Sequence, residues 1–325
     1  MIELVARSGA MREALRLAGR VASTDANVLV TGESGAGKDA LALFVHAMSG
    51  RAMGPFVKID CAALPAELLE AELFGYEKGA FTGAAAAKPG RLEAAHKGTL
   101  VLDEIAHLTR DAQAKLLRVI ERREFERLGG RRTVRVDARL LALTNVDLDD
   151  AVRRRAFRED LFYRLNVVRI HVPPLRERRE DVEPLASKFL AAYAAKHGRP
   201  ARGFGREALE ALGSYDFPGN VRELANVVER AVIVAEGPEV GAADLPESLR
   251  ASAASPGARR ARRPTLAELE DVYIREVLAD ARGNKSEAAR VLGISRKNLY
   301  EKLARYEKGV GSQVTGAGEN PESDT

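Results

Sequence analysis

One segment carries the architecture of this chain: Gly32-Glu33-Ser34-Gly35-Ala36-Gly37-Lys38-Asp39. It follows a short apolar run at residues 28–31 and opens a helical pattern at residues 38–48. Backbone N–H groups of a glycine-rich turn at a helix start bind phosphate, and a lysine placed like Lys38 reaches the β- and γ-phosphates of a nucleotide. Asp39 stands where a hydroxyl usually binds Mg²⁺, so a carboxylate is the expected metal ligand. A glycine-rich turn alone is often only a tight turn, so a second signal is needed.

The second signal is an apolar strand pattern that ends in Asp103 and Glu104. The carboxyl ends of parallel strands meet at the sheet edge where ligands bind, so we expect both acids beside the glycine-rich loop. In ATPases with such a loop, an aspartate holds Mg²⁺, and the neighbouring glutamate can polarise the attacking water. The two segments together predict a chain that binds and hydrolyses ATP with Mg²⁺.

Residues 1–250 alternate short apolar runs with helical patterns, which is typical of a parallel sheet with crossover helices. We expect strands at residues 28–31, 56–59, 100–102, 139–143 and 167–172, and helices at residues 11–21, 38–48, 111–122 and 159–165. Helical patterns at residues 181–196, 206–214 and 221–234 follow, with no strand expected between them. This order predicts an α/β fold: a sheet domain at residues 1–172, which holds the ATP motifs, then a small helical subdomain at residues 173–250.

The C-terminal part of the chain differs in composition. Residues 251–264 are basic and lack apolar periodicity, which predicts a flexible linker, and residues 309–325 are rich in Gly, Ser and acids, which predicts a disordered tail. Between them, residues 265–308 predict an all-α domain that contains a helix-turn-helix, two short helices joined at Gly293.

The helix-turn-helix supplies candidate DNA contacts. Ser295 is placed to cap its second helix, and side chains at the start of such a helix reach base edges. We expect Arg296, Lys297 and Asn298 at the bases, and Arg290 and Lys302 at phosphates. A helical hairpin with a solvated basic face is the alternative. A helix expected at residues 266–281 would supply a dimer seam, because palindromic sites require two-fold partners.

The overall composition excludes several classes of protein. The chain has 325 residues, 46% of them hydrophobic and 30% charged, with a net charge of +4, which is typical of a globular protein of about two domains. Its single cysteine, Cys61, cannot form an internal disulfide, and no apolar stretch is long enough for a membrane helix. We therefore expect a cytoplasmic protein with no membrane partner, in which Cys61 is a packed residue.

Other polar residues are weaker candidates when spacing alone is considered. Thr144 and Asn145 end another apolar run and could sense the γ-phosphate of a nucleotide. Arg158, Arg164 and Arg222 could neutralise phosphate charge. Most arginines only solvate surfaces, so spacing alone leaves these three roles open.

The segment Gly79-Ala80-Phe81-Thr82-Gly83-Ala84 carries a more specific signal. With the ATP motifs, it makes residues 3–308 resemble bacterial enhancer-binding proteins of the NtrC type, AAA+ ATPases that activate sigma-54-dependent transcription. A loop of this composition can swing and present Phe81 and Thr82 to a partner. Without the resemblance, a core Phe in an ordinary loop is the preferred interpretation.

The resemblance implies an AAA+ fold with a helical lid, a Fis-type helix-turn-helix, and a role for each motif. Lys38 and its loop bind ATP, Asp103 holds Mg²⁺ and Glu104 orients water. Thr144 and Asn145 are the first sensor, Arg158 and Arg164 the arginine fingers for a neighbouring subunit's ATP, Arg222 the second sensor, and residues 79–84 the sigma-factor contact. Asp60 stands where the family often has an Asn that holds the catalytic Glu in an inactive position, and an Asp there could repel Glu104 instead.

The resemblance also implies partners: the sigma-54 RNA polymerase holoenzyme, double-stranded DNA upstream of the promoter, and further copies of the chain, from a dimer to a hexameric ring. The phosphate loop lies close to the first residue, so we expect control by a separate regulatory protein, constitutive activity, or a shortened chain. Two alternatives remain open. One is an AAA+ helicase or remodelling chaperone, and the other is a DNA-binding regulator with a vestigial ATPase.

Overall fold

The computed structural model describes residues 4–81 and 84–253 and, further along the chain, residues 270, 273–274, 277–278, 281, 284–299 and 302. The chain divides into two compact units, Met1–Ala254 and Ser255–Thr325. In the described part of the chain, no helix is both long enough and apolar enough to cross a bilayer.

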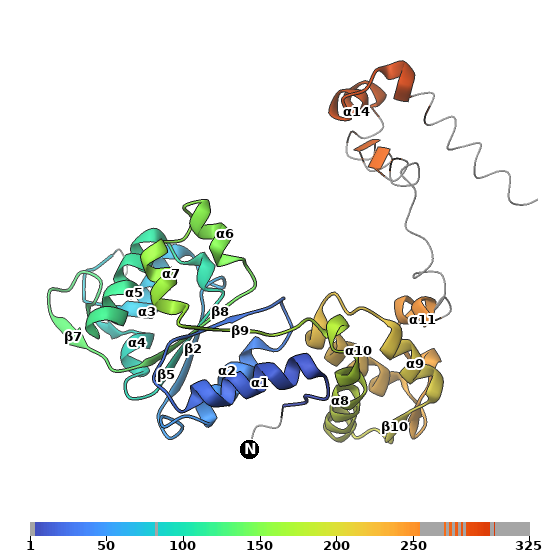
Figure 1. Cartoon of the computed structure of the whole chain (residues 1–325), viewed down its shortest axis with the longest axis horizontal. Helices are drawn as coiled ribbons and strands as arrows, with labels where there is room; N and C mark the ends of the chain where they lie inside the picture. The colour runs from blue at the N-terminus through green and yellow to red at the C-terminus, as the bar shows by residue number, and fades with distance from the viewer. Residues whose placement is uncertain are drawn as a thin grey trace, which may run out of the picture. The chain divides into compact units, whose positions relative to one another are not determined.

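A five-stranded parallel sheet lies at the centre of the first unit (Figure 1). Its strands are β1 (Val28–Thr31), β2 (Phe56–Asp60), β5 (Thr99–Asp103), β8 (Arg139–Thr144) and β9 (Val168–His171), in the order β2-β5-β8-β1-β9. The five predicted strands are confirmed, each to within one residue at either end. The prediction succeeds because parallel strands are buried on both faces and therefore appear as continuous apolar runs.

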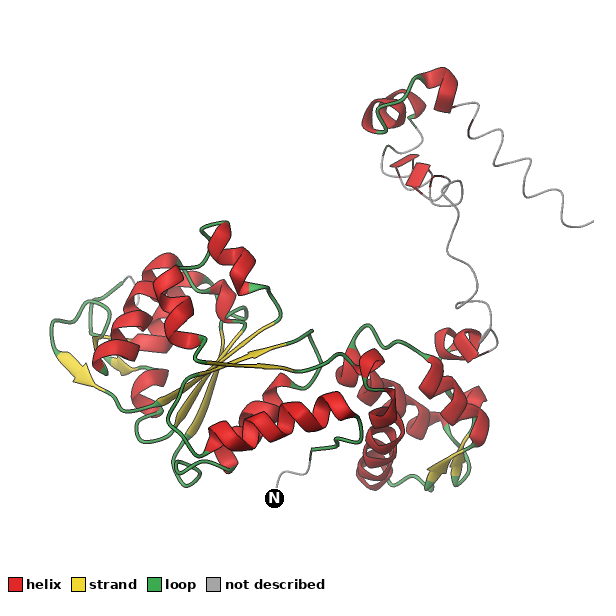
Figure 2. Ribbon diagram, viewed as in Figure 1, coloured by secondary structure: helices red, strands yellow, loops and turns green. Residues whose placement is uncertain are grey.

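Helices cover both faces of this sheet (Figure 2). On one face α1 (Gly9–Ala22) and α2 (Lys38–Ala47) share a core with Val28, Val30 and Val101. On the other face Leu29, Leu100 and Leu102 pack with side chains of the remaining helices. Those helices are α3 (Ala66–Phe74), α4 (Arg91–Ala94), α5 (Arg110–Arg122), α6 (Leu148–Arg153) and α7 (Glu159–Leu165). Side chains of alternate residues in each strand therefore lie on opposite faces of the sheet and pack against the helices there.

Two hairpins extend from the face of the sheet that α3 to α7 cover. In one, β3 (Gly75–Tyr76) pairs with β4 (Lys88–Pro89), and in the other β6 (Glu124–Glu126) pairs with β7 (Thr133–Arg135). Gly75 has φ of 76°, and a Cβ there would lie 2.6 Å from the backbone nitrogen of Gly90. The first hairpin therefore needs glycine at its base.

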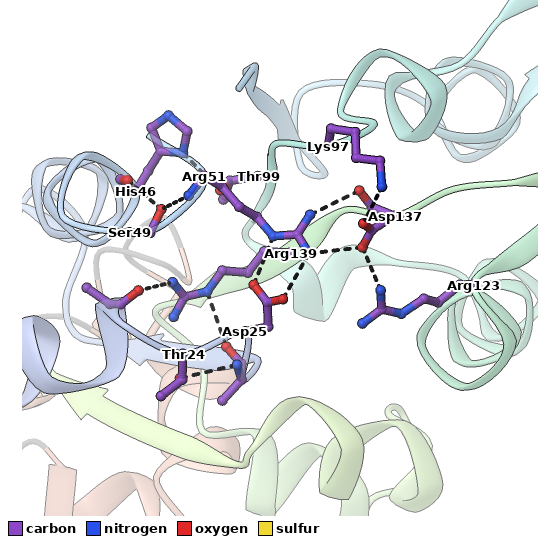
Figure 3. Close-up of polar contacts among 12 residues, drawn as sticks. Thr24, Asp25, His46, Ser49, Arg51, Lys97, Thr99, Arg123, Asp137 and Arg139 are labelled. Atoms are coloured by element: carbon purple, nitrogen blue, oxygen red, sulfur yellow. Dashed lines mark hydrogen bonds and ion pairs between the residues drawn. The ribbon is translucent and has the colours of Figure 1, made fainter. Parts of the chain in front are cut away.

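The strand starts are held by a polar network at the edge away from the phosphate loop (Figure 3). Arg139 begins β8, is buried, and donates to the carbonyl oxygens of Val21 at 2.8 Å and Ala22 at 3.0 Å, at the end of α1. Nearby, Arg51 binds Asp25 at 2.9 Å and Asp137 at 2.9 Å. The buried guanidinium thus binds the Ala22 carbonyl at the helix end and adds a bond to the Val21 carbonyl, which also accepts from Thr24.

The lid has its own core and consists mainly of helices: α8 (Val182–His197), α9 (Arg206–Ser214), α10 (Asn220–Val234) and α11 (Glu247–Ala253). The expectation that no strand lies among them is wrong. A two-residue strand β10 (Gly203–Phe204) precedes α9 and pairs in parallel with β11 (Glu239–Val240). Pairings this short leave no alternating pattern in the sequence.

The second unit contains the predicted helix-turn-helix. Its helix α14 (Lys285–Val291) is capped by Asn284, Gly293 follows with φ of 66°, and residues 296–299 are again helical. Ser295 Oγ accepts from the Asn298 backbone N–H at 3.2 Å, which confirms the predicted cap. The apolar side chains at this turn, Ala289, Leu292, Ile294 and Leu299, contribute to one small core. The linker was expected at residues 251–264, but residues 251–253 form the end of α11, so its expected start is wrong by three residues. Residues 254–264 and the expected tail lie outside the described residues.

Candidate active site

The glycine-rich loop joins the end of β1 to the start of α2, as predicted. Gly35 and Gly37 have φ of 75° and 106°, conformations that fold the backbone N–H groups into a concave turn. The Lys38 side chain is buried, and its Nζ donates to the carbonyl oxygens of Gly32 at 2.9 Å and Glu33 at 3.2 Å. A helix start, a concave backbone and a buried ammonium therefore meet at one point, which suits a phosphate group.

Asp103 and Glu104 lie beside this loop. Glu104 has φ of 51°, a conformation that costs energy for a residue with a side chain and is typical of functional sites. Its Oε1 lies 3.7 Å from Lys38 Nζ, and its Oε2 accepts from the Asn145 backbone N–H at 3.2 Å. The left-handed turn after β5 thus directs Glu104 between the phosphate loop and the end of β8.

A lysine that the sequence analysis missed joins the two expected metal ligands. Lys58 Nζ lies 2.7 Å from Asp103 Oδ2 and also binds Asp39 Oδ1. Burial alone lowers the pKa of Lys58, but its hydrogen bonds to Asp103 and Asp39 outweigh burial and raise it. The strand register could have identified Lys58. In the parallel sheet Lys58 is opposite Val101, which lies two residues before Asp103, so the side chains of Lys58 and Asp103 project from the same face of the sheet, the one that α2 covers.

The lid contributes the other side of the site. Arg222 donates to Ser34 Oγ at 3.1 Å, and the Val221 backbone N–H donates to Gly35 O at 3.0 Å. A pocket of about 240 Å³ lies between the two parts of the unit. Its lining includes Ser34, Gly35, Gly37, Lys38, Asp39, Asp103 and Glu104 from the loop side and Phe189, Val221, Arg222 and Ala225 from the lid.

Glu33 and Ala36 of the loop are engaged by the lid segment. The Glu33 carboxylate accepts two hydrogen bonds from Arg176, at 2.6 and 2.8 Å, and one from Asn220 at 3.0 Å. Arg176 and Asn220 hold the pKa of Glu33 at about 2. The Ala36 carbonyl accepts from Arg178, which is buried. Arg176, Arg178 and Asn220 have no local relation to the loop in sequence, so spacing could not identify them.

Three predicted residues lie near the site without entering the pocket. Thr144 is buried, and its hydroxyl accepts from the Val146 backbone N–H at 3.0 Å. Asp60 accepts from the Ala62 backbone N–H at 2.9 Å. Cys61 is packed, and burial together with nearby acids raises the pKa of its thiol to about 12. A reactive thiolate is therefore absent at this position.

The two candidate arginine fingers lie away from the pocket of their own chain. Arg158 pairs with Asp160 at 2.8 Å, and Arg164 pairs with Glu121 at 3.1 Å. Arg158 lines a different hollow of about 830 Å³ together with Arg110, Arg153 and Arg155. Neither Arg158 nor Arg164 therefore lines the nucleotide pocket of its own chain.

The loop between β3 and β4 exposes an aromatic ring. Phe81 is 40% exposed, and its ring meets the edge of Tyr76 at 5.0 Å, so Phe81 is not a core residue. Gly79 has φ of 82°, and its N–H donates to Ala84 O at 2.9 Å, which closes the loop. Ala80 lies in this turn, and Thr82 and Gly83 lie outside the described residues.

The expected DNA-contacting side chains are exposed at the start of the second helix: Ser295, Arg296, Lys297 and Asn298. Arg290 pairs with Glu287 at 2.6 Å on α14, and Lys302 pairs with Glu270 at 2.7 Å. Arg290 is exposed and Lys302 is half-buried. The exposed polar face therefore includes the positions predicted to read bases.

Comparison with known proteins places each part of the chain. Residues 4–171 match the Sigma-54 interaction domain, residues 176–262 the AAA+ ATPase lid domain, and residues 265–306 the bacterial regulatory protein, Fis family. Regulatory protein AtoC of Escherichia coli K12 is 44% identical over 310 residues, which cover 93% of this chain and 67% of AtoC. Transcriptional regulatory protein FlbD of Caulobacter vibrioides is 45% identical and is covered to 70%.

A solved structure agrees over nearly the whole chain. NtrX from Brucella abortus, crystallised in complex with ATP, is 37% identical, with a TM-score of 0.71 over 94% of this chain and 70% of NtrX. The predicted α/β fold with a helical lid and a following Fis-type helix-turn-helix is confirmed. The chain belongs to the NtrC-type family of sigma-54-dependent transcription activators, in which an AAA+ ATPase is joined to a DNA-binding Fis-type helix-turn-helix.

Proposed function

We propose that this activator hydrolyses ATP in the pocket between Lys38 and Arg222 and uses the cycle to drive residues 79–84 against sigma-54. The observation that carries the proposal is the position of Glu104, which contacts both Lys38 and the Asn145 backbone. A carboxylate there can orient water toward a phosphate bound at the loop. Its contact with the end of β8 connects hydrolysis to Thr144 and Asn145, the first sensor.

Mg²⁺ fits the residues of this site. The carboxylates of Asp39 and Asp103 converge on one cationic nitrogen, so their oxygens already surround a positive charge. Two carboxylates are enough, because Mg²⁺ commonly uses one or two carboxylates plus substrate phosphates. When bound, Mg²⁺ neutralises charge on the phosphate oxygens.

The remaining residues of the pocket position the nucleotide. The backbone from Gly32 to Asp39 binds phosphate oxygens, Lys38 reaches the β- and γ-phosphates, and Arg222 acts from the lid as the second sensor. Asp60 is engaged by the backbone of Ala62, so we propose that it does not hold Glu104 as an Asn does in relatives.

Turnover requires a second subunit. Arg158 and Arg164 have side chains 34% and 61% exposed and lie outside their own pocket, which supports action as arginine fingers on a neighbouring subunit's ATP. Because such a contact joins different surfaces of identical chains, repeated head-to-tail contacts close a ring, which we take to be a hexamer. Arginine fingers raise the rate of other NTPases by roughly 10³–10⁵, so an isolated subunit should be nearly inactive.

The activator does mechanical work on the polymerase while its helix-turn-helix is bound to DNA. Residues 79–84, with Phe81 exposed, contact sigma-54 in the RNA polymerase holoenzyme. Arg296, Lys297 and Asn298 read bases of double-stranded DNA, while Arg290 and Lys302 contact phosphates. We therefore propose that the protein acts in the bacterial cytoplasm, at the nucleoid when it is bound to DNA.

In vitro transcription from a sigma-54 promoter tests the proposal. ATP should give open complexes, whereas a non-hydrolysable analogue should not. Glu104→Gln should retain ATP binding and lose phosphate release, and Thr82→Ala should hydrolyse ATP but fail to open the promoter. Open complexes formed by Thr82→Ala at the wild-type rate would exclude the loop as transmitter, and DNA-strand separation without polymerase would favour a helicase instead.

A further inference from the structure

Lys58 occupies a position that none of the roles above explains. It lies on β2, one of the two edge strands of the five-stranded sheet, and its Nζ reaches the start of α2 and the end of β5. Its two partners, Asp39 and Asp103, are the two carboxylates expected to hold the metal. One ammonium group therefore binds both metal ligands at once.

The charges in this cluster explain why a cation is needed there. Asp103 has a side chain only 15% exposed, so its charge is poorly hydrated, and Asp39 brings a second negative charge to the same nitrogen. Without a cation between them, two carboxylates this close repel each other. Lys58 supplies one positive charge, and Mg²⁺ would supply two.

A lysine can leave such a position more easily than a fixed group can. Its ammonium is a compact charge on a flexible four-carbon chain, and the Lys58 side chain is 35% exposed. Lys58 also lines a separate hollow of about 350 Å³, whose walls include Asp60, Glu72, Lys88 and Arg91. Glu72 already pairs with Lys88 and Arg91, so the hollow offers the displaced amine space and Asp60 as an acidic neighbour.

We propose that Lys58 is an internal counter-cation, which holds Asp39 and Asp103 in place before nucleotide arrives and which the divalent ion displaces. The inference rests on the proposed ATP site, because it assigns these two carboxylates to the metal. It makes Lys58 a positioning residue that lowers the affinity for free divalent ion. The metal then enters favourably only with nucleotide, whose phosphates supply further oxygen ligands.

Binding of Mn²⁺, used in place of Mg²⁺ and followed by electron paramagnetic resonance, tests the competition. Without nucleotide, Lys58→Met should bind Mn²⁺ roughly tenfold or more tightly than the wild type, because a positive charge a few ångströms from the metal is removed. Lys58→Arg should bind like the wild type. Lys115→Met is the matched control, since Lys115 is 39% exposed, pairs with Glu70 at 2.7 Å and lies outside the pocket.

The outcomes separate this inference from the proposed function. Equal Mn²⁺ affinity in Lys58→Met and the wild type, with normal binding in the presence of a non-hydrolysable ATP analogue, overturns the role of Lys58 alone. No Mn²⁺ binding in any variant, even with the analogue, overturns the proposed metal site and this inference with it.

Amine labelling tests displacement directly. Acylation of Lys58, measured by mass spectrometry in the presence of the analogue, should be faster with Mg²⁺ than with EDTA, because the displaced amine loses its two carboxylate partners. Labelling of Lys115 should not change. Slower labelling of Lys58 with Mg²⁺ would mean that the amine binds the phosphates or stays with its carboxylates, and would refute displacement.

Discussion

Asn220 connects the lid to the phosphate loop, and replacing it should weaken both the fold and nucleotide binding. The side chain is fully buried. Its Oδ1 accepts from the Leu175 backbone N–H at 2.8 Å, and its Nδ2 donates to Ser34 O at 3.1 Å and Glu33 Oε2 at 3.0 Å. Asn220 has φ of 55°, so Asn220→Gly removes the side chain without adding backbone strain.

The expected loss follows from these contacts. Two neutral hydrogen bonds at about 1 kcal/mol each and one bond to a carboxylate at about 1.5–3 kcal/mol sum to roughly 3.5–5 kcal/mol. Glu33 is 41% exposed and its bond is partly screened, so we expect a fall of about 3 kcal/mol in the free energy of unfolding. Asn220→Ala should lose roughly 1 kcal/mol more, because alanine is strained at positive φ.

Urea unfolding followed by circular dichroism, combined with titration of a fluorescent ATP analogue, measures both effects. We expect the affinity for the ATP analogue to fall about tenfold or more. A tenfold fall corresponds to about 1.4 kcal/mol, which is less than the loss expected in the free energy of unfolding. Asn27→Gly is the control, because Asn27 makes a single exposed hydrogen bond to Arg164 O at 3.0 Å. If Asn220→Gly unfolds like this control, or binds the analogue as the wild type does, the lid is not connected to the loop through Asn220.

Three further predictions concern pH, ion pairing and domain function. Burial, with a smaller contribution from Arg139, lowers the pKa of His46 below 6.5, so the free energy of unfolding is highest above that pH and decreases as the pH drops through it. In urea unfolding at pH 8 and pH 5.5, His46→Gln should therefore lose less stability on acidification than the wild type. An equal loss in both proteins would contradict this prediction. Hydrogen bonds from Arg51 and Lys97 lower the pKa of Asp137 from 3.8 to about 2. Asp137→Asn should therefore reduce the free energy of unfolding by about 1–2 kcal/mol at pH 7, after allowance for screening, and this reduction should shrink as the pH falls from about 4 toward 2. A reduction that does not depend on pH would mean that the charge of Asp137 is not responsible. Deletion of residues 265–308 should leave phosphate release intact and abolish binding to a specific site in a gel-shift assay, whereas retained specific binding would move the DNA reader elsewhere in the chain.

The features that could be predicted from sequence are those encoded by neighbouring residues. The strands around Leu29, Leu100 and Leu141 are buried on both faces and give continuous apolar runs, so their positions were predictable. Helix α3 and the hairpins were not predicted, because the apolar residues of α3 do not gather on one helix face and the strands contain only two or three residues.

The parts of the site that escaped prediction depend on contacts between distant segments. Arg176 and Asn220 contact Glu33 from more than a hundred residues away, and no local spacing encodes such a pair. Lys58 lies on a different strand from Asp103, so its role needed the strand register as well as the motif. Motifs located the chemistry, whereas the side chains that hold those motifs in place became visible only in the fold.

The bonds of Lys38 suggest how the lid can respond to nucleotide. Lys38 Nζ donates to the carbonyl oxygens of Gly32 and Glu33, and a phosphate that attracts this ammonium competes with both bonds. The Glu33 side chain is held at the same time by Arg176 and Asn220 of the lid. A shift in the Glu33 backbone therefore pulls on two lid residues whose charge-assisted bonds resist stretching. We therefore expect occupancy of the pocket to shift the lid through these contacts between the lid and the phosphate loop.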